Sequence, residues 1–235
     1  ALRTASNARA FTSKAEAILG VKIDIIDGNQ EARYIFEGVK QLSSLLAPSM
    51  IVDIGGGTTE IAVIALGGIV CDKSVKIAGD VFTNDIVYYM RTQHNLFVGE
   101  STAEKIKITV GAALEDLETP PDEMSVQGRD LLTGKPKQVD VSYREIAKAL
   151  DKSIQRIEDA VMETLSQTPP ELAADIYNTG IYLAGGGSML RGLDKRISQK
   201  TDLPVYIAED PLRAVVRGTG MALKNINKYK GILIK

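Results

Sequence analysis

Two glycine-rich stretches carry the residues in this sequence that could do chemistry. The first runs from Ile51 to Val63, where an apolar β-branched run ends at Asp53 and three glycines and two threonines follow. This order predicts a strand, a tight turn and a returning strand. Gly55, Gly56 and Gly57 permit positive φ and remove every Cβ that would block a ligand, and successive backbone N–H groups in such a turn bind anions. An aspartate at the mouth of a phosphate-binding turn is placed to hold Mg²⁺, usually through water.

The residues after this turn distinguish it from other types of phosphate-binding loop. No Gly-Lys-Ser or Gly-Lys-Thr follows the glycines, so the turn is not a Walker loop. Thr58 and Thr59, with Glu60 beyond them, favour a phosphate-binding turn in which the threonines help to orient water. The alternative is an ordinary glycine-rich hairpin, because three glycines alone are weak evidence for a ligand.

A second glycine cluster supports the first. Gly185, Gly186 and Gly187 follow the apolar segment from Ile181 to Ala184. The pattern predicts a strand, a turn and the start of a helix, whose N-terminal N–H groups would face an anionic ligand. Two such turns, one between strands and one between a strand and a helix, indicate a nucleotide held between two glycine-lined edges.

The elements that must position these turns follow from periodicity and capping. Gly67-Gly68 is the expected hairpin turn between the last two strands of a three-stranded meander. Asp80 is the expected N-cap of a helix, and Ser101 with Glu104 forms an expected capping box at the next one. Strands are predicted at 50–54, 60–66, 69–77, 124–129, 137–141, 180–183 and 205–207, and helices at 81–93, 143–167, 171–177 and 190–201, with a further helix opened by Asp210-Pro211.

The N-terminal part is predicted to contain helices at 2–19 and 30–46 around a short strand at 21–26. Gly20 is a helix stop, and Pro48 breaks the second helix.

Composition sets the broad class. The chain of 235 residues is 44% hydrophobic and 25% charged, which is ordinary for a soluble globular protein. A formal net charge of −2 gives no sign of nucleic-acid binding. The single cysteine cannot form an internal disulfide, which fits a reducing cytoplasm. The sequence contains no membrane-spanning window or signal peptide, and its start without Met predicts a fragment or a trimmed chain.

From about Ser49 to the C-terminus, the sequence resembles the MreB family of bacterial actins. The motifs that carry this resemblance are Asp53–Val63, Ala78–Asp80, Gly99–Lys107, Thr168–Leu172, Ala184–Leu193 and Ala208–Leu212 with Arg217–Gly220.

The resemblance implies an α/β fold, namely an actin-like ATPase lobe of the ribonuclease H-like type with a mixed sheet and flanking helices, plus a small α+β insertion subdomain. It implies a nucleotide-binding core at 49–79 and 144–210 with an inserted subdomain at 80–143. Residues 1–48 would belong to the first lobe, and 211–235 would form a C-terminal helix returning to it. The N-terminal half of the full fold, with the family's first phosphate loop and membrane-binding segment, is expected to be absent.

The resemblance also implies ATP with Mg²⁺ between the lobes. Gly55 to Thr58 would hold the β and γ phosphates, and Asp53 would orient the hydrated Mg²⁺. Gly185 to Gly187 would run along the adenosine and the α-phosphate, with Glu104 and Lys107 at the sugar and base. From spacing alone, these last two residues lie on one helical face and form a solvated ion pair.

Glu31 is the expected residue that positions or deprotonates the attacking water, together with Asp53 and Thr58 in the catalytic set. The family places its catalytic glutamate near the start of the helix that leads into the Asp53 strand. The alternative is that Glu31 is an acid at a helix start, where it favours the helix dipole.

Residues 1–45 resemble a different family of the same superfamily, the exopolyphosphatases and guanosine-pentaphosphate phosphohydrolases. Ala1–Ala8 and Ile26–Arg33 carry this resemblance. It predicts a seam near Leu46 to Met50, as in a natural hybrid or an engineered chimera.

Three functions follow as hypotheses. The first is an ATP-binding cytoskeletal protein that self-associates into filaments at the cytoplasmic membrane periphery and acts with cell-shape and elongation proteins, without nucleic acid. Its ATPase activity would be weak or absent in this chain. The second is a phosphohydrolase acting on polyphosphate or guanosine pentaphosphate. The third is an inactive chimeric fragment.

Overall fold

The computed structural model of the chain describes residues 6–23, 25, 34, 48–65 and 68–224. The catalytic candidate Glu31, almost all of the expected helix 30–46 and Gly67 of the expected hairpin turn lie outside these residues. None of the helices in the described part is long and apolar enough to cross a membrane.

The main sheet has five strands in the order β3-β2-β1-β7-β8. The first three, β1 (Ser49–Ile54), β2 (Thr59–Ala65) and β3 (Gly68–Val75), form the predicted antiparallel meander. β7 (Ile181–Ala184) pairs in parallel with both β1 and β8 (Val205–Ile207). Because β1 and β7 run in parallel, the two glycine turns that follow them leave the sheet at the same edge.

β1 is buried on both faces of the sheet, and all six of its residues are buried. Met50, Val52 and Ile54 belong to the larger core cluster, whereas Ile51 belongs to a smaller cluster on the other side. A strand that is covered on both faces requires a continuous apolar run rather than an alternating pattern. Asp53 interrupts that run only where the strand reaches its turn.

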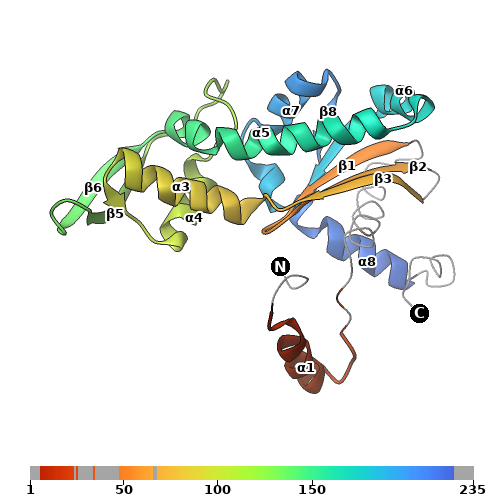
Figure 1. The fold of residues 1–235 in the computed structure, drawn as a ribbon, viewed down its shortest axis with the longest axis horizontal. Helices are drawn as coiled ribbons and strands as arrows, with labels where there is room; N and C mark the ends of the chain where they lie inside the picture. The colour runs from red at the N-terminus through yellow and green to blue at the C-terminus, as the bar shows by residue number, and fades with distance from the viewer. Residues whose placement is uncertain (1–5, 24, 26–33, 35–47, 66–67, 225–235) are drawn as a thin grey trace.

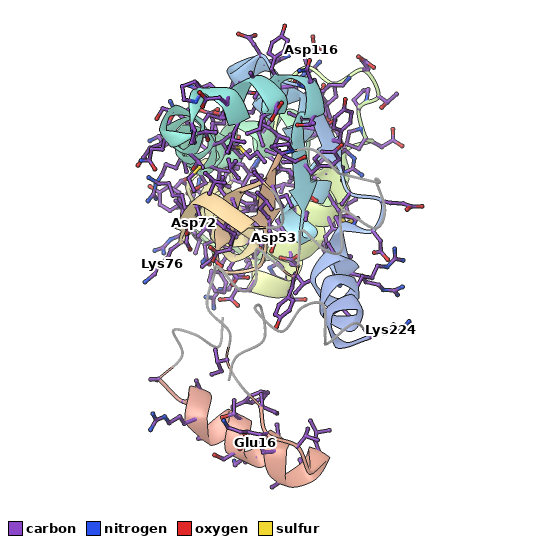
Figure 2. The ribbon with its side chains drawn as sticks, turned by 90° about the vertical axis from the view of Figure 1, so that its right-hand side faces the viewer. Glu16, Asp53, Asp72, Lys76, Asp116 and Lys224 are labelled. Carbon is purple, nitrogen blue, oxygen red and sulfur yellow. The ribbon has the colours of Figure 1, made fainter. Side chains whose placement is uncertain are left out.

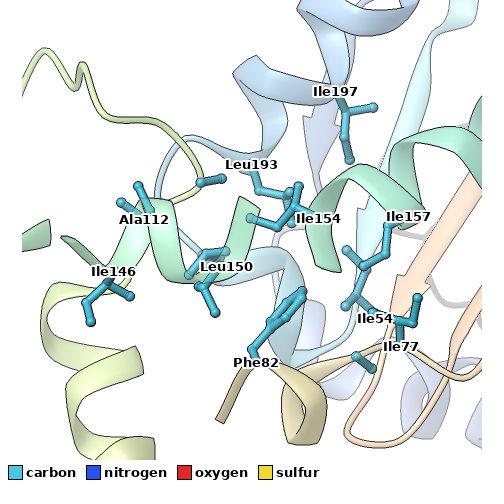
Figure 3. Packing of buried hydrophobic residues seen from close by; sticks show 14 of the residues in the cluster. Ile54, Ile77, Phe82, Ala112, Ile146, Leu150, Ile154, Ile157, Leu193 and Ile197 are labelled. Carbon is cyan, nitrogen blue, oxygen red and sulfur yellow. The ribbon is translucent and has the colours of Figure 1, made fainter. Parts of the chain in front are cut away.

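Two helices cover opposite faces of this sheet (Figure 1). α5 (Tyr143–Gln167) has the predicted bounds and the predicted capping box between Ser142 and Glu145. In Figure 3 its apolar residues Ile146, Leu150, Ile154 and Ile157 lie in the core together with side chains of the sheet, α3 and α7. α8 (Ala214–Lys224) lies on the other side, where Ala214 joins the smaller cluster.

A second sheet of three strands, in the order β4-β5-β6, lies at the far end of α3 and α4 (Figure 1). β5 (Met124–Asp130) and β6 (Pro136–Val141) form the expected hairpin. The two-residue strand β4 (Leu96–Phe97) is too short to show in the sequence pattern. The division into a core and an inserted subdomain stays a prediction.

The remaining elements have these bounds: α1 (Ala8–Leu19), α3 (Gly79–Gln93), α4 (Glu100–Val110), α6 (Pro170–Thr179), η2 (Gly186–Met189), α7 (Leu193–Thr201) and η3 (Pro211–Arg213). Gly20 ends α1 in the left-handed conformation, as expected of a glycine stop. Residues 21–23 and 25, which were expected in a strand, are irregular.

Two predicted helix caps are wrong. Ala78, not Asp80, is the N-cap of α3, and Asp80 lies in the first turn of the helix. Gly99, not Ser101, is the N-cap of α4, with no side-chain cap. Glu104 is not available for a capping box because its carboxylate bonds to Thr83 and Lys107 instead.

The helix start expected after Gly187 is also different. The second glycine turn leads into the short 3₁₀ helix η2, and the α-helix begins only at Leu193.

Candidate nucleotide-binding site

The first glycine turn presents a row of open backbone donors. The N–H of Gly55 closes the turn on the carbonyl of Thr58 at 3.0 Å. Within the described part of the chain, the N–H groups of Gly56, Gly57 and Thr58 have no protein acceptor. Gly56 is exposed and its two successors are half-buried. Three consecutive N–H groups at a surface turn suit an anion such as a phosphate.

The reason expected for these glycines is partly wrong. None of the three has a positive φ. A Cβ at Gly56 would instead lie 3.6 Å from Oδ1 of Asp80, and one at Gly57 would lie 3.9 Å from Oδ2 of the same carboxylate. The glycines therefore keep the mouth of the turn open beside Asp80, rather than allowing an unusual backbone conformation.

The second glycine turn has the backbone freedom that the first lacks. Gly185 has φ +79° and ψ 167°, a combination that is essentially restricted to glycine. Its N–H donates to the carbonyl of Pro211 at 3.0 Å, and the hydroxyl of Ser188 donates to its carbonyl at 2.7 Å. Among the described residues, the N–H groups of Gly186 and Gly187 have no protein acceptor, so this turn also presents open donors.

The second turn packs against the end of β1, directly before the first turn. A Cβ at Gly185 would overlap Oδ1 of Asp53 and the carbonyl oxygen of Ile54, and a Cβ at Gly187 would overlap the side chain of Ile54. The parallel pairing of β1 with β7 places Asp53 opposite Ala184, the residue before the second turn. The sheet therefore joins both turns and Asp53 into one continuous surface.

Asp53 lies at the bottom of this surface. The residue is only 5% exposed, whereas Lys76 and Asp116 are exposed and lie at the outline of the molecule in Figure 2. A carboxylate in this position, next to open backbone amides, has the chemistry to interact with a hydrated cation. Groups of three or more histidine, cysteine, aspartate or glutamate side chains that could hold a metal ion do not occur among the described residues.

The start of α3 is tied to the first turn through its backbone. The N–H of Gly79 donates to the carbonyl of Gly55 at 3.1 Å, and the N–H of Asp80 donates to the carbonyl of Gly56 at 2.8 Å. These two bonds fix the position of the turn relative to the helix.

Lys107 of α4, paired with Glu104, contacts the start of α3 beside the first turn. Nζ of Lys107 donates to the carbonyl of Gly79 at 2.8 Å, to Oγ1 of Thr83 at 3.0 Å and to Oε2 of Glu104 at 2.7 Å. An ammonium group has three N–H donors, so all three are used within the protein. Lys107 therefore links α4 to the start of α3, whereas Oε1 of Glu104 has no protein partner among the described residues.

The surroundings of Glu104 favour its ionised form. Burial alone would raise the pKa of its carboxyl, but hydrogen bonds from Lys107 and Thr83 outweigh that effect and lower it. The Glu104 side chain is 47% exposed and that of Lys107 is 15% exposed. The negative carboxylate is thus the accessible member of the pair. The pair is not the solvated ion pair that spacing alone suggested.

The other expected site residues lie in different surroundings. Thr58 is half-buried in the first turn, next to the open donors. Thr59 is fully buried, and its hydroxyl donates to the carbonyl of Ile77 at 2.6 Å, so its side chain serves the core. Glu31 lies outside the described residues, and its catalytic role stays a prediction.

Two residues at the centre of the network were not expected. Gly79 contacts both the first turn and Lys107, and Thr83 contacts both Lys107 and Glu104. The motif Ala78-Gly79-Asp80 gave a signal for the first of them. Nothing in the sequence pairs Thr83 with Glu104, which lies 21 residues further along the chain.

A separate cavity of about 690 Å³ lies between α5, α7 and the loop 113–116, away from both turns. Arg196 on its wall bonds to the carboxylates of Glu158 and Asp151 at 2.9 Å each and to the carbonyl of Ala113 at 3.1 Å. These ion pairs bind α7 to α5. The open backbone donors lie at the glycine turns, and Glu104 is linked to the first turn through Lys107 and Gly79, so these residues form the candidate site.

Comparison with known proteins identifies the family of the chain. A family model described as MreB/Mbl protein matches residues 42–231. The chain belongs to the MreB/Mbl family. It is 46% identical to the cell shape-determining protein MreB of Escherichia coli (strain K12) over 185 residues, which is 79% of this chain and 53% of that protein. It is 43% identical to the cell shape-determining protein Mbl of Bacillus subtilis (strain 168) over 180 residues, or 77% of this chain and 54% of that protein. The chain thus spans about half the length of these relatives.

Solved structures confirm the actin-like ATPase fold. MreB5 of Spiroplasma citri bound to AMPPNP matches with a TM-score of 0.83 and 36% identity, covering 97% of this chain and 67% of that chain. Its ADP-bound form matches with a TM-score of 0.84 and the same identity, covering 97% of this chain and 68% of that one. A MamK double helical filament, 24% identical with a TM-score of 0.70, shares the fold.

The second resemblance drawn from residues 1–45 finds no support. The structural match to MreB5 of Spiroplasma citri covers 97% of the chain, so it extends across the expected seam near residues 46–50. The family model likewise begins at residue 42, before that seam. These findings favour one family along the chain, and nothing favours a phosphohydrolase or a chimera.

Proposed function

We propose that this chain is the nucleotide-binding part of an ATP-dependent bacterial actin that sets cell shape. One observation carries the proposal: two glycine turns with open amides meet around Asp53 at one edge of the sheet. The names of the E. coli and B. subtilis relatives supply the cellular role, and the AMPPNP and ADP bound to MreB5 of Spiroplasma citri support nucleotide binding.

In this proposal, ATP lies across both turns. The amides of Gly56, Gly57 and Thr58 hold the β and γ phosphates, and those of Gly186 and Gly187 lie along the α-phosphate and the adenosine. Charge-assisted hydrogen bonds from backbone donors to phosphate oxygens are strong, and they need no cationic side chain. This fits a turn that lacks the Walker lysine.

The remaining groups orient the nucleotide and its cation. Glu104 accepts hydrogen bonds from the nucleoside sugar, with Lys107 holding its carboxylate in place. Asp53 binds the water shell of Mg²⁺, and Asp80 borders the same mouth. The cation would neutralise phosphate charge, which is why two aspartates near a polyanion are compatible with binding.

Hydrolysis would depend on positioning an attacking water and neutralising charge. Glu31 is the proposed group for that water, with Thr58 beside the phosphates.

The intact protein is proposed to form filaments at the cytoplasmic side of the membrane and to act there with cell-shape and elongation proteins. Residues 49–79 and 144–210 would form the nucleotide-binding core, with 80–143 inserted into it. The double helical filament of MamK, a protein with the same fold, supports the self-association part of this proposal.

ATP-dependent sedimentation tests this proposal. The chain is incubated with ATP and Mg²⁺, with ADP and Mg²⁺, or without nucleotide, and then centrifuged. Pelleting that requires ATP supports an assembling bacterial actin. A soluble chain in all three conditions that releases phosphate from polyphosphate would contradict it and favour a phosphohydrolase.

A further inference from the structure

We propose that Thr83 is a positioning residue that fixes the carboxylate of Glu104 for the nucleoside. This inference rests on the proposed nucleotide function and adds a residue to it. Thr83 lies in the second turn of α3 and is only 7% exposed, so it does not itself face the open mouth of the site.

The hydroxyl of Thr83 joins two helices at one point. It lies 2.7 Å from Oε2 of Glu104 and 3.0 Å from the carbonyl oxygen of Gly79, and it accepts from Nζ of Lys107 at 3.0 Å. A hydroxyl has one proton to donate and two lone pairs. The bond to Glu104 is the shorter one and has an ionised acceptor, so it is the stronger use of that proton.

The two carboxylate oxygens of Glu104 differ in their hydrogen-bond partners. Oε2 receives both Thr83 and Lys107, which lock the side chain from two sides. Oε1 has no partner among the described residues and belongs to a side chain that is 47% exposed. A carboxylate held on one oxygen is a preorganised acceptor for hydroxyl donors on the other.

The same contacts link the nucleoside side of the site to the phosphate side. Lys107 bonds to the carbonyl of Gly79, whose N–H bonds to the carbonyl of Gly55 in the first turn. Oγ1 of Thr83 accepts from the same Nζ of Lys107 at 3.0 Å. Thr83 therefore holds Glu104 at a fixed position relative to the amides that bind phosphate.

The test removes the hydroxyl without changing the shape of the side chain. Thr83→Val replaces it with a methyl group, and Thr83→Ser keeps it. Thr164→Val is the matched control, because Thr164 is likewise a buried helical threonine, in α5, and its hydroxyl donates to the carbonyl of Ala160 away from the site. Calorimetry measures the affinity of each protein for ATP with Mg²⁺, and for 2′,3′-dideoxy-ATP with Mg²⁺, which lacks the sugar hydroxyls.

We expect Thr83→Val to bind ATP about tenfold more weakly, as for loss of one hydrogen bond to a charged group. Thr83→Ser and Thr164→Val should bind like the unchanged protein. The unchanged protein should prefer ATP over dideoxy-ATP, and Thr83→Val should lose most of that preference, because its carboxylate is no longer held for the sugar.

Other outcomes would overturn the inference. If Thr83→Ser is as weak as Thr83→Val, the shape of the side chain matters rather than its hydroxyl. If Thr83→Val keeps its affinity, or loses the same factor for both nucleotides, Thr83 does not act through the sugar contact of Glu104. Absence of any nucleotide binding by the unchanged, folded protein would instead overturn the proposed nucleotide function, and this inference with it.

Discussion

Gly185→Ala combines two separate costs, backbone strain and overlap with Asp53 and Ile54. The new side chain would have to adopt φ +79° and ψ 167°, a region essentially closed to other residues, which costs about 2 kcal/mol. Its Cβ would also overlap Oδ1 of Asp53 and the carbonyl oxygen of Ile54. Overpacking of this kind costs about 2 kcal/mol more, so we expect a total loss near ~4 kcal/mol in the free energy of unfolding.

Two other glycines separate these contributions. Gly134 has φ +73° but no atom within 4 Å of a new Cβ, so Gly134→Ala should cost about 1 kcal/mol from backbone strain alone. Gly180, at the opposite end of β7, has φ +79° and ψ −168°, and its Cβ would overlap the carbonyl oxygen of Pro204. Gly180→Ala should therefore destabilise about as much as Gly185→Ala.

Urea unfolding followed by circular dichroism measures all three variants against the unchanged protein. The predicted order of the losses is Gly185→Ala close to Gly180→Ala, and both well above Gly134→Ala. A loss for Gly185→Ala no larger than that for Gly134→Ala would refute the claim that the second turn is packed tightly against Asp53 and Ile54.

Three further predictions concern the network around the site and the core. Gly79→Ala places a Cβ 3.3 Å from Nζ of Lys107, so we expect weaker ATP binding by calorimetry. Stability against urea should stay level or rise, since alanine favours helices over glycine. Equal affinity for ATP would contradict the link between α3 and α4. Arg196→Met leaves the buried carboxylate of Glu158 without its cation and should lower the free energy of unfolding in urea by about 3 kcal/mol. A second change, Glu158→Leu, should restore most of that loss. A loss for the single variant below that of a surface ion pair would contradict a buried ion pair between α5 and α7. Burial raises the pKa of the Glu145 carboxyl, but hydrogen bonds from Ser142 and the contact with His94 outweigh it, so the folded pKa lies below the ordinary value of 4.5. This carboxyl therefore stabilises the fold above pH 4.5 and loses that contribution as the pH falls through the folded pKa; Glu145→Gln should flatten the decline in melting temperature over that window, and an unchanged decline would count against the assignment.

Local signals in the sequence were enough for much of the fold. The capping box of Ser142 and Glu145 and the apolar stripe that follows it predicted α5 with its observed bounds, because both signals lie within the helix. The same holds for the meander of β1 to β3, whose apolar runs are separated by glycine turns. The two glycine patterns also indicated that both turns serve one ligand, but no local signal predicted the parallel pairing of β1 with β7 that brings them together.

The errors arose where a distant partner decided the local structure. Ser101 and Glu104 fit a capping box in sequence, but the carboxylate is taken by Thr83 on another helix. Thr59 fits a water-orienting hydroxyl, yet its side chain faces the core and bonds to Ile77. Such competition between local and tertiary partners is invisible without the packing of α3 against α4 and of β2 against its neighbours.

Calorimetric titration of this chain with ATP and Mg²⁺, beside the variant Asp53→Asn, tests the central claim most directly. We expect saturable binding to one site in the unchanged protein and its loss in the variant, with both proteins folded by circular dichroism. A folded protein that shows no binding, or a variant that binds ATP with unchanged affinity, would contradict the claim that the two glycine turns around Asp53 form a nucleotide site.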